Sequence, residues 1–201
     1  MSDNRKRGAI LISGRGSNMV SLLRAAQHED FPVEFTAVIS DKIEAPGLSI
    51  ATSAGIKTHA LRRCRDGRDA WEEELHDLLT EAEIDLVCLA GFMRLLSPAF
   101  VAEWEGRILN IHPSLLPKYK GLNTHARAIE AGDDTAGCSV HMVTADLDDG
   151  PILGQSQVPI HVGDTPETLA ARVLEQEHIL YPQLLRKFLS DMALPNGGFG
   201  A

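Results

Sequence analysis

Short, strongly apolar segments alternate with longer segments of helical periodicity along almost the whole chain, and this alternation restricts the possible folds more than any other feature. The apolar run at residues 86–90 contains no charged or hydroxyl side chain, as expected for a strand that is covered on both faces. Strands that alternate with helices form a mostly parallel sheet. The sequence therefore predicts an α/β, Rossmann-like fold with a mostly parallel twisted sheet and helices on both faces.

The expected elements share apolar periodicity bounded by turn residues. Strands are expected at residues 9–12, 35–40, 57–61, 86–90, 107–111, 138–143 and 152–158. Helices are expected after Ser17, at 47–54, at 68–83, after Ser97-Pro98, at 124–131 and at 166–190. The last helix should place Leu169, Val173, Leu180, Leu184 and Phe188 on one face. Pro182 should kink or divide this helix, because proline has no N–H to donate.

Length and charge favour a single-domain protein that binds small molecules. We expect one domain over residues 1–201, with an ordered core at about 8–190 and flexible ends at 1–7 and 195–201. The formal net charge of −9 disfavours nucleic acid and anionic membranes as partners. Neither a membrane-length apolar run nor a secretory signal is present, which predicts a cytoplasmic protein. The sequence does not decide between a monomer and a homodimer. Three scattered cysteines predict neither a disulfide framework nor a metal site.

A glycine-rich loop follows the first expected strand. Gly14 and Gly16 allow close approach of the backbone, and we expect Ser17 to cap the next helix, so that the loop can bind an anion such as a phosphate. The dinucleotide fingerprint requires a third glycine where Met19 stands, although Asp41 resembles its ribose-binding acid. A phosphate site, a dinucleotide site and a simple tight turn remain alternatives.

The segment from Asn110 to Pro117 is the most unusual in the chain. Because side chains two apart in a strand point the same way, Asn110 and His112 should lie on one face. An amide beside an imidazole at a rigid strand end suits oxyanion stabilisation and proton transfer. The alternative is a polar pair that closes the strand and caps a turn.

Two further acidic features need an explanation. Asp146, Asp148 and Asp149 lie in one loop, and a carboxylate near His112 would orient the ring and favour its protonated form. The pattern alone does not choose among the three, and a solvated acidic turn is the alternative; the calcium-loop pattern is absent. Glu177 falls on the apolar face of the last helix, where it needs a partner, either a substrate or a salt bridge.

Six segments, in this order and spacing, resemble the folate-dependent phosphoribosylglycinamide formyltransferase family, of the monofunctional type. They cover residues 12–18, 89–98, 110–117, 121–125, 137–141 and 147–151, and the resemblance extends over about residues 9–188. It implies a Rossmann-like formyltransferase domain that uses 10-formyltetrahydrofolate as formyl donor and glycinamide ribonucleotide as acceptor in purine biosynthesis, without a metal.

The resemblance also implies a role for each matching residue. Asn110 would reach the formyl oxygen, His112 would donate a proton, and Asp148 would keep His112 protonated. The ribonucleotide and its phosphate would be bound by Gly16, Ser17, Asn18 and Glu177. The folate would be bound by Arg68, Met93, Arg94, Leu95, Leu96 and Asn110.

Three positions, Arg15, Lys120 and Asp149, depart from the commoner bacterial pattern of this family. Arg15 and Lys120 could add phosphate affinity or face solvent.

Three other functions are alternatives to glycinamide ribonucleotide formylation. Formyl transfer to initiator methionyl-tRNA would require a second, basic domain, and hydrolysis of the formyl-folate a small regulatory domain. A non-catalytic nucleotide-binding module would leave Asn110 and His112 unexplained.

Overall fold

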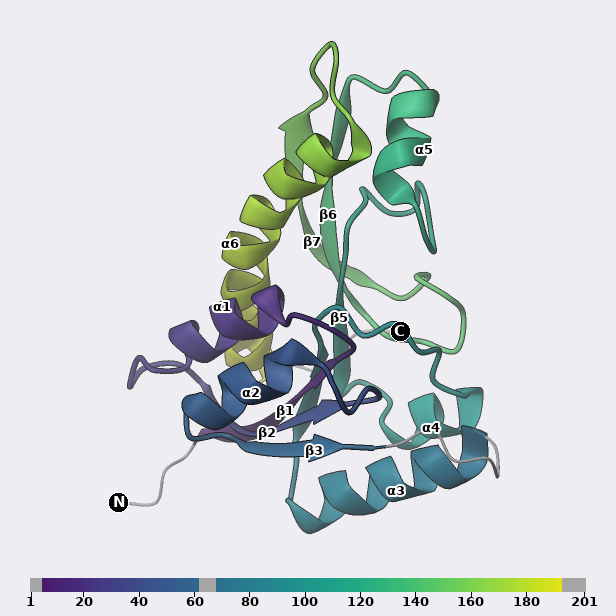
Figure 1. The fold of residues 1–201 in the computed structure, drawn as a ribbon. Helices are drawn as coiled ribbons and strands as arrows, with labels where there is room; N and C mark the ends of the chain where they lie inside the picture. The colour runs from purple at the N-terminus through teal and green to yellow at the C-terminus, as the bar shows by residue number, and fades with distance from the viewer. Residues whose placement is uncertain (1–4, 62–67, 193–201) are drawn as a thin grey trace.

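A computed structural model describes residues 5–61 and 68–192 of the chain (Figure 1). The strands are β1 (Lys6–Ile12), β2 (Val33–Ser40), β3 (Lys57–Ala60), β4 (Leu86–Leu89), β5 (Ile108–His112), β6 (Thr135–Met142) and β7 (Ile152–Pro159). The helices are α1 (Ser17–Ala25), α2 (Pro46–Ser53), α3 (Arg68–Glu81), α4 (Pro98–Glu103), α5 (Thr124–Glu130) and α6 (Pro166–Met192). In these two ranges, no helix combines the length and the apolar character needed to cross a bilayer.

The strands form one sheet in the order β3-β2-β1-β4-β5-β6-β7. The first five strands are parallel, while β6 runs antiparallel to both of its neighbours. From β1 the chain continues to β2 on one side, and β4 then lies on the other side of β1, so the order reverses between β1 and β4. Ligands of such sheets bind beyond the carboxyl ends of the strands at that reversal. The predicted α/β fold with a mostly parallel sheet is confirmed.

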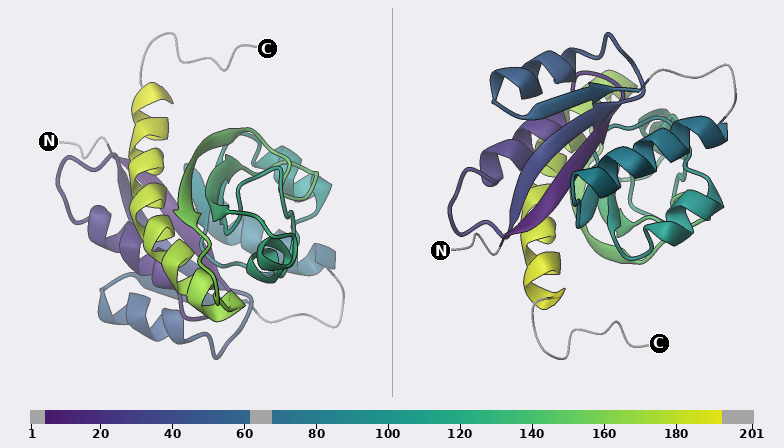
Figure 2. Two further views of the ribbon diagram at one scale, coloured as in Figure 1. Left: turned by 90° about the horizontal axis from the view of Figure 1, so that it is seen from above. Right: turned by 90° about the horizontal axis from the view of Figure 1, so that it is seen from below.

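Helices cover both faces of the sheet and enclose two cores. Along β1, Ile10 and Ile12 face a core shared with α1, α2 and α6, whereas Ala9 and Leu11 face a core shared with α3 and α4. Figure 2 shows α6 along one face and α3 on the other. This alternation follows from the two-residue repeat of a strand, and it explains why residues 9–12 of β1 are all apolar.

The boundaries of the elements agree closely with those expected from the sequence, with one difference near the N-terminal end. β1 begins at Lys6, so Lys6 and Arg7, which we expected to be flexible, belong to the sheet. The side chain of Asp85 accepts a hydrogen bond from the backbone N–H of Arg7 at 2.8 Å, which ties this end to the turn before β4. The tail at 195–201, for which we also expected flexibility, lies outside the described residues.

The expected apolar face of the last helix was partly wrong. Tyr181 and Leu185 are fully buried, while Leu180 and Leu184 are only partly buried at the edge of the core. Residues four apart lie on the same face of a helix, and steps of four from Leu169 lead to Tyr181 and Leu185, which therefore face the core. Because tyrosine carries a polar hydroxyl, the apolar pattern of the sequence does not reveal that Tyr181 belongs to this face. Pro182 does not divide the helix, which is continuous from Pro166 to Met192.

The hydroxyl of Tyr181 connects α6 to the centre of the sheet. It donates to the carbonyl oxygens of Leu89, the last residue of β4, and Leu109, the second residue of β5, at 3.2 and 3.0 Å. Tyr181 is completely buried, and burial raises its pKa well above the ordinary value, so the phenol stays protonated. A single O–H therefore serves backbone acceptors on two neighbouring central strands.

Replacing Tyr181 with phenylalanine should reduce the free energy of unfolding by about 1–2 kcal/mol, because two buried carbonyl groups lose their donor. Urea denaturation of the wild type and the variant measures this difference. Tyr119→Phe is the matched control, since its hydroxyl bonds the carboxylate of Asp133 at a partly exposed site. A loss in the control as large as that of Tyr181→Phe would contradict the special role of the buried hydroxyl.

Candidate active site

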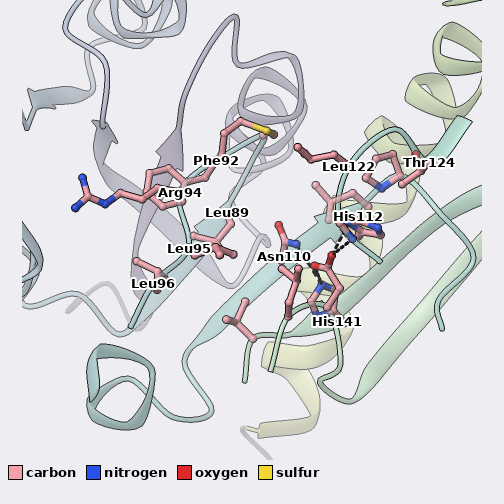
Figure 3. A pocket seen from close by; sticks show the side chains of 18 of the residues that line it. Leu89, Phe92, Arg94, Leu95, Leu96, Asn110, His112, Leu122, Thr124 and His141 are labelled. Atoms are coloured by element: carbon pink, nitrogen blue, oxygen red, sulfur yellow. Dashed lines mark hydrogen bonds and ion pairs between the residues drawn. The ribbon is translucent and has the colours of Figure 1, made fainter. Parts of the chain in front are cut away.

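A cavity of about 680 Å³ opens at the carboxyl edge of the sheet, next to the reversal of strand order (Figure 3). Its walls come from the segment after β4, the end of β5, the start of α5 and the loop between β6 and β7. Asn110, His112 and Asp148 all line it. The sequence had placed the first two residues on one face of a strand, and the structure brings the distant Asp148 to them.

His112, the last residue of β5, is held on both ring nitrogens. Its Nδ1 lies 3.3 Å from a carboxylate oxygen of Asp148, and its Nε2 lies 3.0 Å from the carbonyl oxygen of Tyr119. Both partners are acceptors, and an imidazole donates from both nitrogens only when it is protonated. With only 6% of His112 exposed, this surrounding is arranged for the imidazolium form.

Asp148 is the aspartate of the acidic loop that contacts His112. Its side chain is 8% exposed, and one of its oxygens also accepts the backbone N–H of Gly121 at 2.9 Å. The backbone of Asp148 has φ = 50°, a left-handed conformation that aspartate tolerates better than most residues. Asp146 is exposed, and Asp149 forms an ion pair with Lys120. The loop thus turns one carboxylate inward and the other two toward solvent.

Two more histidines that the sequence left unassigned lie at this cavity. The Nε2 atom of His141 is 3.1 Å from the side-chain nitrogen of Asn110 and 3.6 Å from Asp148. Burial lowers the pKa of His125, and the neighbouring His112 lowers it further. His141 could have been recognised as a site residue only from the antiparallel register that pairs it with Asn110. The sequence alone does not give this register.

The glycine-rich loop has the geometry expected of an anion site, although its capping residue was predicted wrongly. Gly16 occupies the cap position with φ = 72°, and Ser17 is the first residue of α1 and makes no side-chain cap. The first bond across this turn joins the N–H of Val20 to the carbonyl of Gly16. The earlier amides of the first turn have no acceptor within the helix, so they can donate to a bound anion.

The neighbouring helix α2 supports this loop through Gly47. The N–H of Gly47 donates to the carbonyl of Gly14 at 3.1 Å. A Cβ atom on Gly47 would lie 2.5 Å from the side chain of Ile12 and 3.0 Å from the Gly14 oxygen. Only glycine fits at this position, and no local sequence pattern singles it out.

Asn18 and Glu177 form a buried pair beside the loop. The Asn18 amide nitrogen donates to Glu177 at 2.6 Å, and each residue is 6% exposed. Burial raises the pKa of Glu177, and the bond from Asn18 acts in the opposite direction. The partner of this buried carboxylate is an uncharged amide, and the buried Oδ1 of Asn18 has no hydrogen-bond partner among the described residues. The pair therefore keeps polar capacity for a ligand.

The residues expected to bind folate form a partly exposed rim. Met93 and Leu95 are 64% and 56% exposed at the cavity, and Leu96 also lines it. Arg94 lines the cavity as well, with its guanidinium 4.2 Å from the ring centre of Trp71, against which it stacks. The side chain of Arg68, at the start of α3, lies outside the described part of the structure.

This rim and the glycine-rich loop share an anchor in Ser13. The Ser13 hydroxyl accepts the backbone N–H of Met93 at 2.8 Å, and the Ser13 N–H donates to the carbonyl of Gly91 at 3.1 Å. The two candidate binding regions are therefore fixed relative to each other.

The structure bears on the dinucleotide alternative for the glycine-rich loop. Met19, at the third-glycine position of the dinucleotide fingerprint, is fully buried, and its terminal carbon would lie 3.0 Å from a Cβ atom on Gly16. The space beneath the loop is therefore filled by a side chain.

Within residues 5–61 and 68–192, no group of three histidine, cysteine, aspartate or glutamate side chains could hold a metal ion.

The sheet order and the Asn–His–Asp cluster at its carboxyl edge define an α/β enzyme with its site at the reversal of strand order. Residues 6–185 match the formyl transferase family. The chain is 48% identical over 180 residues to phosphoribosylglycinamide formyltransferase of Escherichia coli strain K12, covering 89% of this chain and 85% of that one. The chain belongs to the formyl transferase family.

Solved structures give the same grouping. The crystal structure of phosphoribosylglycinamide formyltransferase from Brucella melitensis superimposes with a TM-score of 0.88 at 55% identity, covering 94% of this chain and 98% of that one. Formyltetrahydrofolate deformylase from Burkholderia mallei shares the fold with a TM-score of 0.85 at 26% identity, covering 98% of this chain and 69% of that one. The similarity in sequence is much greater to the transferase.

The free energy of unfolding of the Glu177→Gln variant should increase relative to that of the wild type as the pH rises. Burial raises the pKa of Glu177 in the folded protein, so its contribution to stability is fully present below the unfolded pKa of about 4.3 and is lost as the pH rises through the folded pKa. Glutamine can still accept the Asn18 bond but does not ionise. Urea unfolding from about pH 4 to pH 8 should show the difference between variant and wild type growing with pH.

The control is Glu175→Gln, which removes an exposed carboxylate from the same helix. Its difference from the wild type should vary little with pH. If the Glu177→Gln difference were equally flat, Glu177 would not be the buried titrating group.

Proposed function

We propose that this protein transfers the formyl group of 10-formyltetrahydrofolate to the amine of glycinamide ribonucleotide, in the cytoplasm, as a step of de novo purine biosynthesis. The observation that carries this proposal is the placement of His112, between Asp148 and the Tyr119 carbonyl, in one cavity with Asn110. The names of the two transferase relatives described above support the choice of acceptor, and the name of the related formyltetrahydrofolate deformylase supports the choice of donor. One domain over residues 1–201 would be sufficient for this reaction.

The two substrates would approach the cluster from opposite ends of the crevice. The ribonucleotide phosphate would accept the amides at Gly16, Ser17 and Asn18, and Glu177 would accept hydrogen bonds from its hydroxyl groups. The folate would lie along residues 93–96, whose exposed apolar side chains suit its aromatic rings. Arg68 remains a candidate for the acidic tail of the folate.

In the proposed reaction, the neutral amine attacks the formyl carbon and a tetrahedral oxyanion forms. An N–H of Asn110 and protonated His112 stabilise the oxyanion. The attack forms the new carbon–nitrogen bond, and the collapse of the oxyanion breaks the bond between the formyl carbon and N10. N10 gains a proton and the amine loses one, and the proton from the amine would pass by way of a water molecule to His112 and restore its protonated form. His112 would supply the proton to N10, and for this its Nε2–H must leave the carbonyl of Tyr119 while Nδ1 stays with Asp148.

Three competing functions make different demands on the chain. Formyl transfer to tRNA calls for a basic surface, whereas the formal net charge here is −9. Hydrolysis of the formyl-folate needs no ribonucleotide and would leave the Asn18–Glu177 pair without a role. A nucleotide-binding module has no use for the buried Asn–His–Asp cluster. Among these, ribonucleotide formylation gives a role both to the Asn18–Glu177 pair and to the Asn–His–Asp cluster.

A formyl-transfer assay tests the proposal directly. Purified protein is mixed with a 10-formylfolate, with and without glycinamide ribonucleotide, and the absorbance of the deformylated folate is followed. We expect product only when the ribonucleotide is present. Product without it would indicate the hydrolase instead, and no product from folded protein in either mixture would favour the binding module.

His112→Ala and Asp148→Ala should each lower kcat by about 100- to 10,000-fold, because the proton donor or its charged partner is lost. The KM values of both substrates should change far less, since neither side chain lies in the expected phosphate or folate contacts. Asp146→Ala, in the same loop but exposed, is the control and should retain activity. Unchanged turnover in either cluster variant would reject its assigned role.

Gly47→Ala should raise the KM for the ribonucleotide by about tenfold or more while changing the KM for the folate little. The added methyl group would collide with Ile12 and the Gly14 carbonyl and displace the loop that we expect to bind phosphate. Ser49→Ala, exposed on the same helix, is the matched control. Equal increases in both KM values would mean that Gly47 supports the fold in general and not the anion loop.

A further inference from the structure

We propose that His141 is a positioning residue that fixes the side-chain amide of Asn110, so that one amide N–H faces the formyl oxygen. This inference rests on the proposed function and adds a residue to it. His141 belongs to β6, and the antiparallel register of β5 and β6 places it directly opposite Asn110. Directly paired residues on neighbouring strands have adjacent side chains, and Figure 3 shows both at the cavity.

The surroundings of His141 fix which ring nitrogen carries the proton. The Nδ1 atom lies 2.9 Å from the carbonyl oxygen of Met142, and a carbonyl can only accept a hydrogen bond, so Nδ1 carries a hydrogen. The ring is 2% exposed. Burial lowers its pKa and His112 acts in the same direction, against the Met142 bond and the charge of Asp148. The ring is therefore neutral, with a lone pair on Nε2.

This lone pair determines the orientation of Asn110. At 3.1 Å, the Nε2 atom accepts a hydrogen bond from the Asn110 amide nitrogen. The amide oxygen would face the lone pair of Nε2 unfavourably, so the amide cannot turn over without losing this bond. One N–H of Asn110 is thus used by His141, and the second is available to a substrate atom in the cavity.

The orientation matters because the two ends of an amide have opposite effects on an oxyanion. A donor at about 2.7–3.1 Å from the developing negative charge stabilises it, whereas a carbonyl oxygen at the same place repels it. Asn110 is partly buried and lines the cavity, and its bond to His141 is the constraint that selects the donor end. A loss of this constraint would lower the population of the active orientation.

Asp148 makes a second, weaker contact with the same ring. Its other carboxylate oxygen lies 3.6 Å from the Nε2 atom of His141, beyond an ordinary hydrogen bond. A protonated Nε2 would turn to this carboxylate and release Asn110. The neutral ring leaves Asp148 to His112, so the two histidines have separate roles, in which His112 carries the charge and His141 directs the amide.

Two substitutions of His141 separate positioning from folding. His141→Phe keeps a flat ring but removes the acceptor, and should lower kcat by about 10- to 100-fold with changes in both KM values below about threefold. His141→Gln offers an amide oxygen as an acceptor and should recover at least severalfold of the lost kcat. Equal kcat values for the two variants, when both unfold at the same urea concentration as the wild type, would overturn the proposal.

A nuclear magnetic resonance experiment on the wild type does not depend on activity or on a variant. Long-range ¹H–¹⁵N correlation spectra of protein labelled at histidine nitrogens distinguish the two neutral tautomers and the charged ring, and the His141→Phe spectrum assigns the signal. We expect the neutral Nδ1–H tautomer at pH 7. The Nε2–H tautomer or a charged ring would overturn the proposal, even if the formyl-transfer assay succeeded. A correct tautomer without formyl transfer would instead reject the proposed function, and with it the role of Asn110.

Discussion

The reversal of strand order between β1 and β4 is the constraint on which the site depends. It leaves a crevice beyond the carboxyl ends of the strands, and three segments that are distant in sequence meet there. The glycine-rich loop follows β1, the exposed rim follows β4, and the Asn–His pair ends β5. Ser13 and Tyr181 then fix these segments to one another with buried hydrogen bonds, so the shape of the crevice is set by the chain itself.

Several buried polar groups lie in and beside that crevice. Asn18, His112, His141 and Glu177 are each at most 6% exposed. A buried polar group reduces stability unless it is hydrogen-bonded, and each of these side chains has a partner within the described residues, except at the Oδ1 atom of Asn18. Their partners differ in kind: His112 lies between two acceptors, the carboxylate of Asp148 and the carbonyl of Tyr119, whereas the Nε2 atom of His141 faces the amide nitrogen of Asn110. The remaining hydrogen-bonding capacity is directed at a ligand.

The fold and the centre of the site could be predicted from the sequence because they depend on local patterns. Apolar runs set the strands, and the two-residue repeat set the common face of Asn110 and His112. The remaining features depend on long-range geometry. The inward turn of Asp148 requires a left-handed backbone and the amide of Gly121, and the place of His141 requires the register of an antiparallel pair. The cap at Gly16 and the buried face of α6 differ from expectation because backbone conformation and packing, not polarity alone, decide them.

The continuous helix α6 has a consequence for how this chain can change. Glu177 and Tyr181 are four positions apart, so they lie on the same face of the helix. Glu177 contacts the anion loop through Asn18, and Tyr181 contacts the backbone of β4 and β5. Deleting one residue between them would rotate one relative to the other by about 100° and withdraw at least one from its partner. Insertions and deletions in α6 can therefore be accommodated only at its two ends, because the spacing of Glu177 and Tyr181 fixes the distance between the anion loop and the sheet contact.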